Sequence, residues 1–231
     1  MEDQSLALAF GNSLTEEVSG LAGEYAELTL DSLVEDGLFK DIPLVSTFTA
    51  VYRIGKSISE RYHIAKLIAF LNEINKGIVD EEKRQNYREK FASNEKFRNR
   101  ELEYILILID RYISFDKPQM LAKLYLAYLD GTIIGEEFTM YAEVIDRFLL
   151  LDRGTLISKS GRYIVYDNIG AEAILRLVAL GLMVETTDTS IFSPDINGGF
   201  SLTVENLKKA VATERVYERT EFGEKLANIL R

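Results

Sequence analysis

The chain has 231 residues, 47% hydrophobic and 28% charged, which is the composition of a folded protein with an apolar core and excludes an intrinsically disordered chain. It contains no cysteine, so a disulfide framework, thiol catalysis and thiolate zinc sites are excluded. Its net charge of −10 argues against a protein that neutralises many nucleic-acid phosphates.

The charge is unevenly distributed along the chain. No lysine or arginine precedes Lys40, whereas nine acidic residues lie between Glu2 and Asp36. Residues 40–117 reverse this balance, with fifteen basic and twelve acidic residues, so a local basic face stays open there. The acidic start lacks the positive charge and the cleavage site of a secretory signal, and we expect a cytoplasmic protein.

Two helices are predicted in the first third of the chain. The first begins near Ser13, which has the capping-box spacing to Glu16, and ends at Gly37. The second covers residues 43–75, where apolar or small residues recur at spacings of three and four.

The middle of the chain is also predicted to be helical. Residues 80–100 are highly charged and predict a solvent-facing helix or helix-loop. Residues 101–113 are apolar on nearly every side, which predicts a central, buried helix. Pro118 opens a further helix that ends at Gly131, and another helix follows Gly135. Such short connections are typical of antiparallel neighbours in a bundle.

The last third predicts a mixture of helix and strand. A helix over residues 169–180 ends at Gly181. Residues 182–186 and 215–220 predict two paired strands, and residues 221–230 predict a closing helix. Two helices followed by a hairpin are the order of a winged helix-turn-helix module.

These patterns predict a mainly α fold with two domains. A helical bundle occupies residues 1–152, and a winged-helix-like α+β module occupies residues 153–231.

The sequence offers little for catalysis. His63 is the only histidine, so serine–histidine catalysis and histidine metal triads lack their parts, and we interpret it as an ordinary helical residue. Acidic pairs at 16–17, 80–82 and 136–137 lie at predicted helix starts, where they complement the helix dipole. Gly198 and Gly199 lack the lysine of a phosphate-binding loop. We predict no enzyme, cofactor or metal site; the weakest alternative is a carboxylate–metal enzyme, which needs acids converging from several segments.

Residues 37–58 form the most informative segment. Its uncharged run, residues 42–52, has eleven residues, well short of the roughly 20 needed to span a bilayer. A buried core helix is favoured, and the alternatives are a partner interface and a helix lying on the inner membrane surface. The residues predicted for partner or membrane contact are Leu38, Phe39, Lys40, Phe48, Tyr52, Arg53 and Lys56.

The predicted helix 169–180 is a poor DNA reader. It offers Arg176 as its one cation, next to Glu172, and most of its other residues are apolar. A packing or protein-interaction module is therefore favoured. In the nucleic-acid alternative the contacting residues are Arg153, Lys159, Arg162 and Arg176.

The order of features resembles the Abi-alpha (abortive infection alpha) family and related bacterial and prophage proteins. The resemblance covers most of the chain: an acidic helical start, Lys40-Asp41-Ile42-Pro43, a charged connection, residues 121–127 and residues 217–223. Lys123 and Glu221 depart from the family's pattern, which has a small or polar residue and a proline there. The resemblance implies a role in phage resistance or in a mobile element, and it transfers no catalytic residue.

We therefore predict a non-enzymatic interaction or effector protein that contacts other proteins, a second copy of itself or a membrane surface. The alternative is a nucleic-acid-associated regulator that uses residues 153–231.

Overall fold

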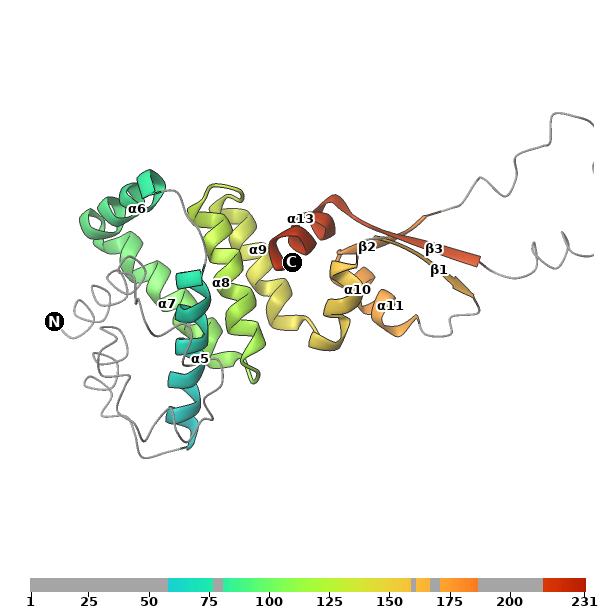
Figure 1. The fold of residues 1–231 in the computed structure, drawn as a ribbon, viewed down its shortest axis with the longest axis horizontal. Coiled ribbons are helices and arrows are strands. Elements are labelled where there is room, and N and C mark those ends of the chain that lie inside the picture. Colours follow the sequence, from blue (N-terminus) through green and yellow to red (C-terminus); the bar gives the residue numbers. More distant parts are fainter. Residues whose placement is uncertain (1–57, 77–80, 159–160, 167–170, 187–213) are drawn as a thin grey trace, which may run out of the picture. The chain divides into compact units, whose positions relative to one another are not determined.

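The structure is a computed structural model that describes residues 58–76, 81–158, 161–166, 171–186 and 214–231 (Figure 1). The chain divides into two compact units, Met1–Asp146 and Arg147–Arg231. The predicted mainly α fold with an α+β C-terminal part is confirmed.

In the described part of the first unit, every element of regular secondary structure is a helix. Its helices are α5 (Ile58–Lys76), α6 (Glu81–Ser93), α7 (Glu95–Arg111), α8 (Asp116–Leu129) and α9 (Gly135–Arg147). The charged stretch 80–100 forms α6 and the first turns of α7. The predicted helix 13–37, and residues 43–57 of the next one, lie outside the described residues.

One face of α5 is buried against α7 and α8. The side chains on this face recur at three- and four-residue spacings, which keeps them on one side of a helix. Burying each of these large apolar side chains contributes about 1.5–3 kcal/mol. They are Ile64, Leu67, Ile68, Leu71 and Ile74.

The helix predicted over residues 101–113 is confirmed through Arg111, but the prediction that it is buried on nearly every side was wrong. α7 begins earlier, where the Asn94 side chain accepts a hydrogen bond from the Phe97 amide at 3.0 Å. Over the full helix only one stripe, which includes Ile109, faces the core, and Ile107 is exposed. Ile113 lies beyond the end of α7 and is exposed as well.

Aromatic rings join α7, α8 and α9. The buried Phe138 of α9 has ring-centroid distances of 6.1 Å to Tyr104, 5.6 Å to Tyr125 and 5.5 Å to Tyr128. Such pairs add about 0.5–1.5 kcal/mol each to the burial of their surface. Phe138 therefore packs α9, the helix predicted after Gly135, against both α7 and α8.

The second unit combines short helices with a small sheet. Its elements are η3 (Leu150–Asp152), α10 (Arg153–Ile157), β1 (Arg162–Tyr166), α11 (Glu172–Ala179), β2 (Met183–Thr186), β3 (Glu214–Arg219) and α13 (Glu221–Leu230). Because η3 packs against α10 and α11, it belongs to this unit, and the boundary precedes the one predicted after residue 152. Gly181, at a φ of +72°, ends α11 as predicted.

The sheet has the order β1-β3-β2 with both pairs antiparallel, and the predicted hairpin is confirmed as β2 and β3. β1, which the sequence analysis did not predict, pairs with the other edge of β3. Val165, Met183 and Tyr217 are buried on one face of the sheet. β1 separates α10 from α11, so the elements before the hairpin are helix, strand and helix.

α13 is fixed where it leaves the sheet. The Thr220 hydroxyl accepts a hydrogen bond from the Gly223 amide at 2.9 Å and lies 2.8 Å from the Gly181 carbonyl oxygen, to which it donates. A Cβ on Gly223 would lie only 1.9 Å from the Leu182 carbonyl oxygen, so α13 approaches this backbone as closely as glycine permits.

We expect Gly223→Ala to lower the free energy of unfolding by about 2–3 kcal/mol, because α13 must move away from Leu182. Gly154→Ala is the matched control, since it lies within α10 with no atom near its added methyl group. It should be neutral or stabilising by about 0.5–1 kcal/mol. Urea denaturation of both variants measures the difference, and equal stabilities would contradict this packing.

Candidate functional site

The residues predicted for partner or membrane contact cannot be placed. Leu38, Phe39, Lys40, Phe48, Tyr52, Arg53 and Lys56 all lie outside the described residues. Their role stays a prediction. Within the described ranges, no helix is both long enough and apolar enough to cross a bilayer.

Arg176, the cation expected to reach DNA, forms an ion pair with an acidic residue of the second unit. Its guanidinium donates two hydrogen bonds to the Asp152 carboxylate, at 2.8 and 2.6 Å. Asp152 is fully buried. The hydrogen bonds to Asp152 raise the pKa of Arg176, so the guanidinium keeps its charge. This bidentate pair joins η3 to α11.

The other cations of the nucleic-acid alternative are also engaged, as far as the structure describes them. Arg153 donates to the Leu230 carbonyl oxygen at 3.1 Å, at the end of α13. Arg162 pairs with Glu218 across the sheet at 3.5 Å. Lys159 lies outside the described residues.

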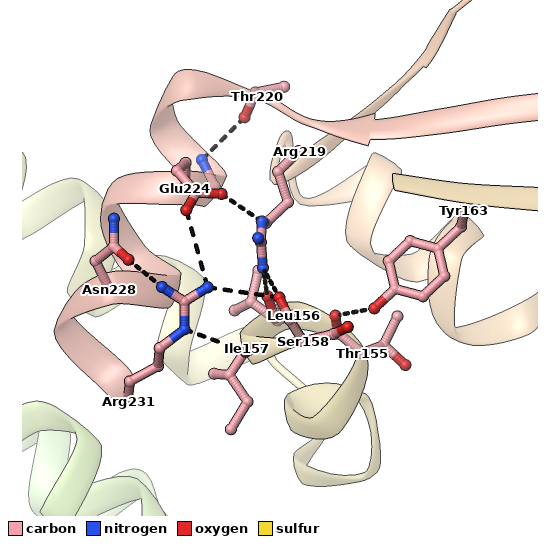
Figure 2. Close-up of polar contacts among 11 residues, drawn as sticks. Thr155, Leu156, Ile157, Ser158, Tyr163, Arg219, Thr220, Glu224, Asn228 and Arg231 are labelled. Carbon is pink, nitrogen blue, oxygen red and sulfur yellow. Dashed lines mark hydrogen bonds and ion pairs between the residues drawn. The ribbon is translucent and has the colours of Figure 1, made fainter. Parts of the chain in front are cut away.

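A second arginine cluster surrounds the carboxyl end of α10 (Figure 2). Arg219 Nη1 donates to the carbonyl oxygens of Leu156 and Ser158, at 2.5 and 2.6 Å. Arg219 Nε lies 2.5 Å from Glu224 Oε2, which balances its charge. A helix leaves its last carbonyl groups without partners in the helix, and Arg219 supplies the missing donors.

Arg231 approaches the same carbonyl groups from α13 (Figure 2). Its Nε donates to the Ile157 carbonyl oxygen at 3.2 Å, and its Nη2 to that of Ser158 at 3.4 Å. Glu224 lies 3.8 Å from Nη2, and Asn228 accepts from Nη1. Two guanidinium groups and one carboxylate therefore close the end of α10.

The first unit uses lysine in the same way. Lys66 of α5 is buried, and its Nζ donates to the carbonyl oxygens of Asp110 and Tyr112, both at 2.8 Å, where α7 ends. Burial lowers the pKa of Lys66, and the negative charge of Asp110 partly opposes this. The ammonium group thus links α5 to the negative end of the α7 dipole.

Two further helix ends are treated alike. The Nη1 of the buried Arg98 donates to the carbonyl oxygens of Phe91 and Ala92, both at 3.2 Å, at the end of α6. Lys117 donates to the Asp146 carbonyl oxygen at 2.7 Å, near the end of α9. These cations stabilise helix ends and are not directed toward a ligand.

Exposed leucines occur on or next to η3 and α11, the two elements that the Arg176–Asp152 pair joins. Leu175 precedes Arg176 on α11 and is 44% exposed, and Leu151 precedes Asp152 on η3 and is 88% exposed. Leu149 is exposed too. We call these three leucines the η3–α11 surface. These large apolar side chains are thus exposed on two elements that an ion pair joins.

The acidic residues show structural contacts. Glu137, at the start of α9, accepts a hydrogen bond from the Ile134 amide at 2.9 Å. Glu101 lies 3.4 Å from the Tyr125 hydroxyl, and burial raises the pKa of Glu101. Across the described ranges there is no group of three or more His, Cys, Asp or Glu side chains that could hold a metal ion.

No protein-family model, curated protein or solved structure matches this chain. The resemblance to the Abi-alpha family therefore stays a prediction.

Sequence reasoning missed the structural roles of several residues. Asp152 was read only as a domain boundary, although it is the buried partner of Arg176. Arg219 and Lys66 bind carbonyl groups that lie 44–63 positions away in the chain. No local pattern connects residues so far apart.

We expect Arg176→Met to destabilise the protein much more than Arg162→Met, because it leaves the Asp152 carboxylate buried without a counterion. The Arg162–Glu218 pair is the control, since both of its side chains are about half exposed. Asp152→Asn combined with Arg176→Met should recover part of the loss. Thermal unfolding compares the variants, and similar losses for both arginines would contradict a role for Arg176 as the counterion of the buried Asp152 carboxylate.

Proposed function

We propose that this chain is a non-enzymatic interaction protein and that its η3–α11 surface binds a second copy of the chain. The observation that supports this proposal is the exposure of Leu149, Leu151 and Leu175 on a framework fixed by the Arg176–Asp152 pair. Removing a fully exposed leucine from water contributes about 1.5–3 kcal/mol, so Leu151 can approach this value, and the half-exposed Leu149 and Leu175 about half of it.

The distribution of charge favours a second copy as the partner. Residues 147–231 contain eleven basic and eleven acidic residues, whereas residues 1–146 contain sixteen basic and twenty-six acidic residues. The whole net charge of the chain therefore belongs to the first unit. Two copies can meet through their neutral second units without the repulsion that two acidic units would create.

The same balance supports protein contact over nucleic-acid contact. Non-specific binding to DNA depends on cations that displace counterions from phosphates. The second unit has no net positive charge, and Arg153, Arg162 and Arg176 contact protein groups. The nucleic-acid regulator has less support than the interaction protein.

The resemblance to the Abi-alpha family supports a biological setting for this contact. We propose that the self-associated chain acts as an effector in bacterial resistance to phage. Plaque counts on bacteria that express the chain, or a variant that does not self-associate, test this setting.

We expect the chain to dimerise in sedimentation-equilibrium experiments and Leu151→Asp with Leu175→Asp to weaken the dimer by at least about a hundredfold. Two anchors worth about 1.4 kcal/mol each account for this factor. Ile113→Asp is the control, because Ile113 is about as exposed as Leu151 but belongs to the first unit, and it should leave the dimer unchanged.

A wild-type chain that stays monomeric, or a dimer that ignores the leucine substitutions, would rule out this surface. A mobility shift with duplex DNA that weakens as salt is added, and that requires Arg162, would favour the nucleic-acid alternative instead.

A further inference from the structure

His63, the only histidine of the chain, lies where α5 meets α7. Its Nδ1 is 2.9 Å from Asp110 Oδ1, near the end of α7. The His63 side chain is 13% exposed, whereas that of Asp110 is 72% exposed. A neutral imidazole with its proton on Nδ1 donates this hydrogen bond without placing a charge in the interface.

The interface already contains one cation. Lys66 lies one turn after His63 on α5, so both side chains extend from the same side of the helix. Its ammonium group is held by the carbonyl oxygens of Asp110 and Tyr112. A protonated His63 would bring a second positive charge into the same buried contact.

We propose that the contact between α5 and α7 is an acid-sensitive joint, which is closed while His63 is neutral and weakened when the imidazole takes up a proton. The incoming proton binds Nε2, which is buried. Asp110 attracts the resulting charge, but it is mostly in water, and the attraction is screened.

The surrounding groups act in opposite directions. Burial lowers the pKa of His63 and exceeds the opposing effects of Asp110, while Lys66 lowers the pKa further. Arg111 of α7 is paired with Asp146. Among the described residues, α8 also packs against α5, and none of its charged side chains contributes to this shift in the pKa of His63. The rings of Tyr62 and Phe115, the residue before α8, lie 4.8 Å apart.

The sign of the pH dependence follows from this shift. A free histidine has a pKa of 6.5, so below pH 6.5 the unfolded chain binds a proton that the folded chain resists. The contribution of His63 to the stability of the fold is therefore present above pH 6.5 and is lost as the pH falls below it. Each unit by which folding depresses the pKa changes the folding equilibrium constant by up to about tenfold.

Glu101 must be separated from this effect. Burial raises the pKa of Glu101, so its protonation in acid stabilises the folded chain and opposes the contribution of His63. Comparing the wild-type chain with His63→Gln removes this term, because Glu101 is present in both.

The test uses the full chain. Proton NMR of the single imidazole should give a titration midpoint below 6.5 in the folded chain and near 6.5 in urea. The thermal midpoint should fall from pH 7.5 to pH 5.5 more in the wild type than in His63→Gln. Asp110→Asn should lower the imidazole midpoint further, because it removes the carboxylate that favours the proton.

An imidazole that titrates at or above 6.5 in the folded chain would overturn the joint, and so would equal pH dependence of the wild type and His63→Gln. If His63→Gln does not fold, the titration of the wild type decides alone. Neither measurement depends on self-association, so these results test the inference independently of the proposed function.

Discussion

The structure depends on cationic side chains that bind the carbonyl groups at helix ends. The last turn of a helix leaves carbonyl oxygens without donors and concentrates negative dipole charge there. In this chain Lys66 serves the end of α7, Arg98 that of α6, Arg219 and Arg231 that of α10, and Arg153 that of α13. Most of these contacts link segments far apart in sequence, so one interaction completes local structure and tertiary packing together. Losing such a contact would therefore weaken the helix end and the tertiary packing together.

This arrangement also shapes what the protein can bind. The chain is acidic, and many of the described cations contact backbone or carboxylate groups. The second unit has balanced charge and exposes leucines on or next to the two elements that the Arg176–Asp152 pair joins. An apolar, neutral surface is suited to another protein surface of the same kind, and this reasoning underlies the proposed self-association. The resemblance to a phage-resistance family adds a setting but no chemistry.

Local patterns predicted much of the fold. The helix 221–230 was predicted with its observed bounds, and in the structure Thr220, predicted as the last strand residue, caps it. The hairpin followed from two short strand-like runs. β1 was missed, although it is longer than β2 and four of its five residues are β-branched or aromatic. The site could be predicted only in part. Arg176 was singled out as a cation, yet its partner Asp152 lies 24 positions away and gave no local signal. Contacts that join distant segments, such as Arg219 with Leu156, depend on the fold itself.

The central claim is that buried cations hold the helix ends, and the unfolding free energy of Lys66→Met tests it most directly. The substitution keeps the apolar stem and removes the donor from two carbonyl groups at the end of α7. We expect a loss of about 1–3 kcal/mol, the cost of leaving buried carbonyl groups without partners. Lys76→Met on the same helix should change stability by less than about 0.5 kcal/mol, because the Lys76 side chain is half exposed and its ammonium group lies 3.5 Å from the Glu73 carboxylate. Equal effects of the two substitutions would contradict the claim.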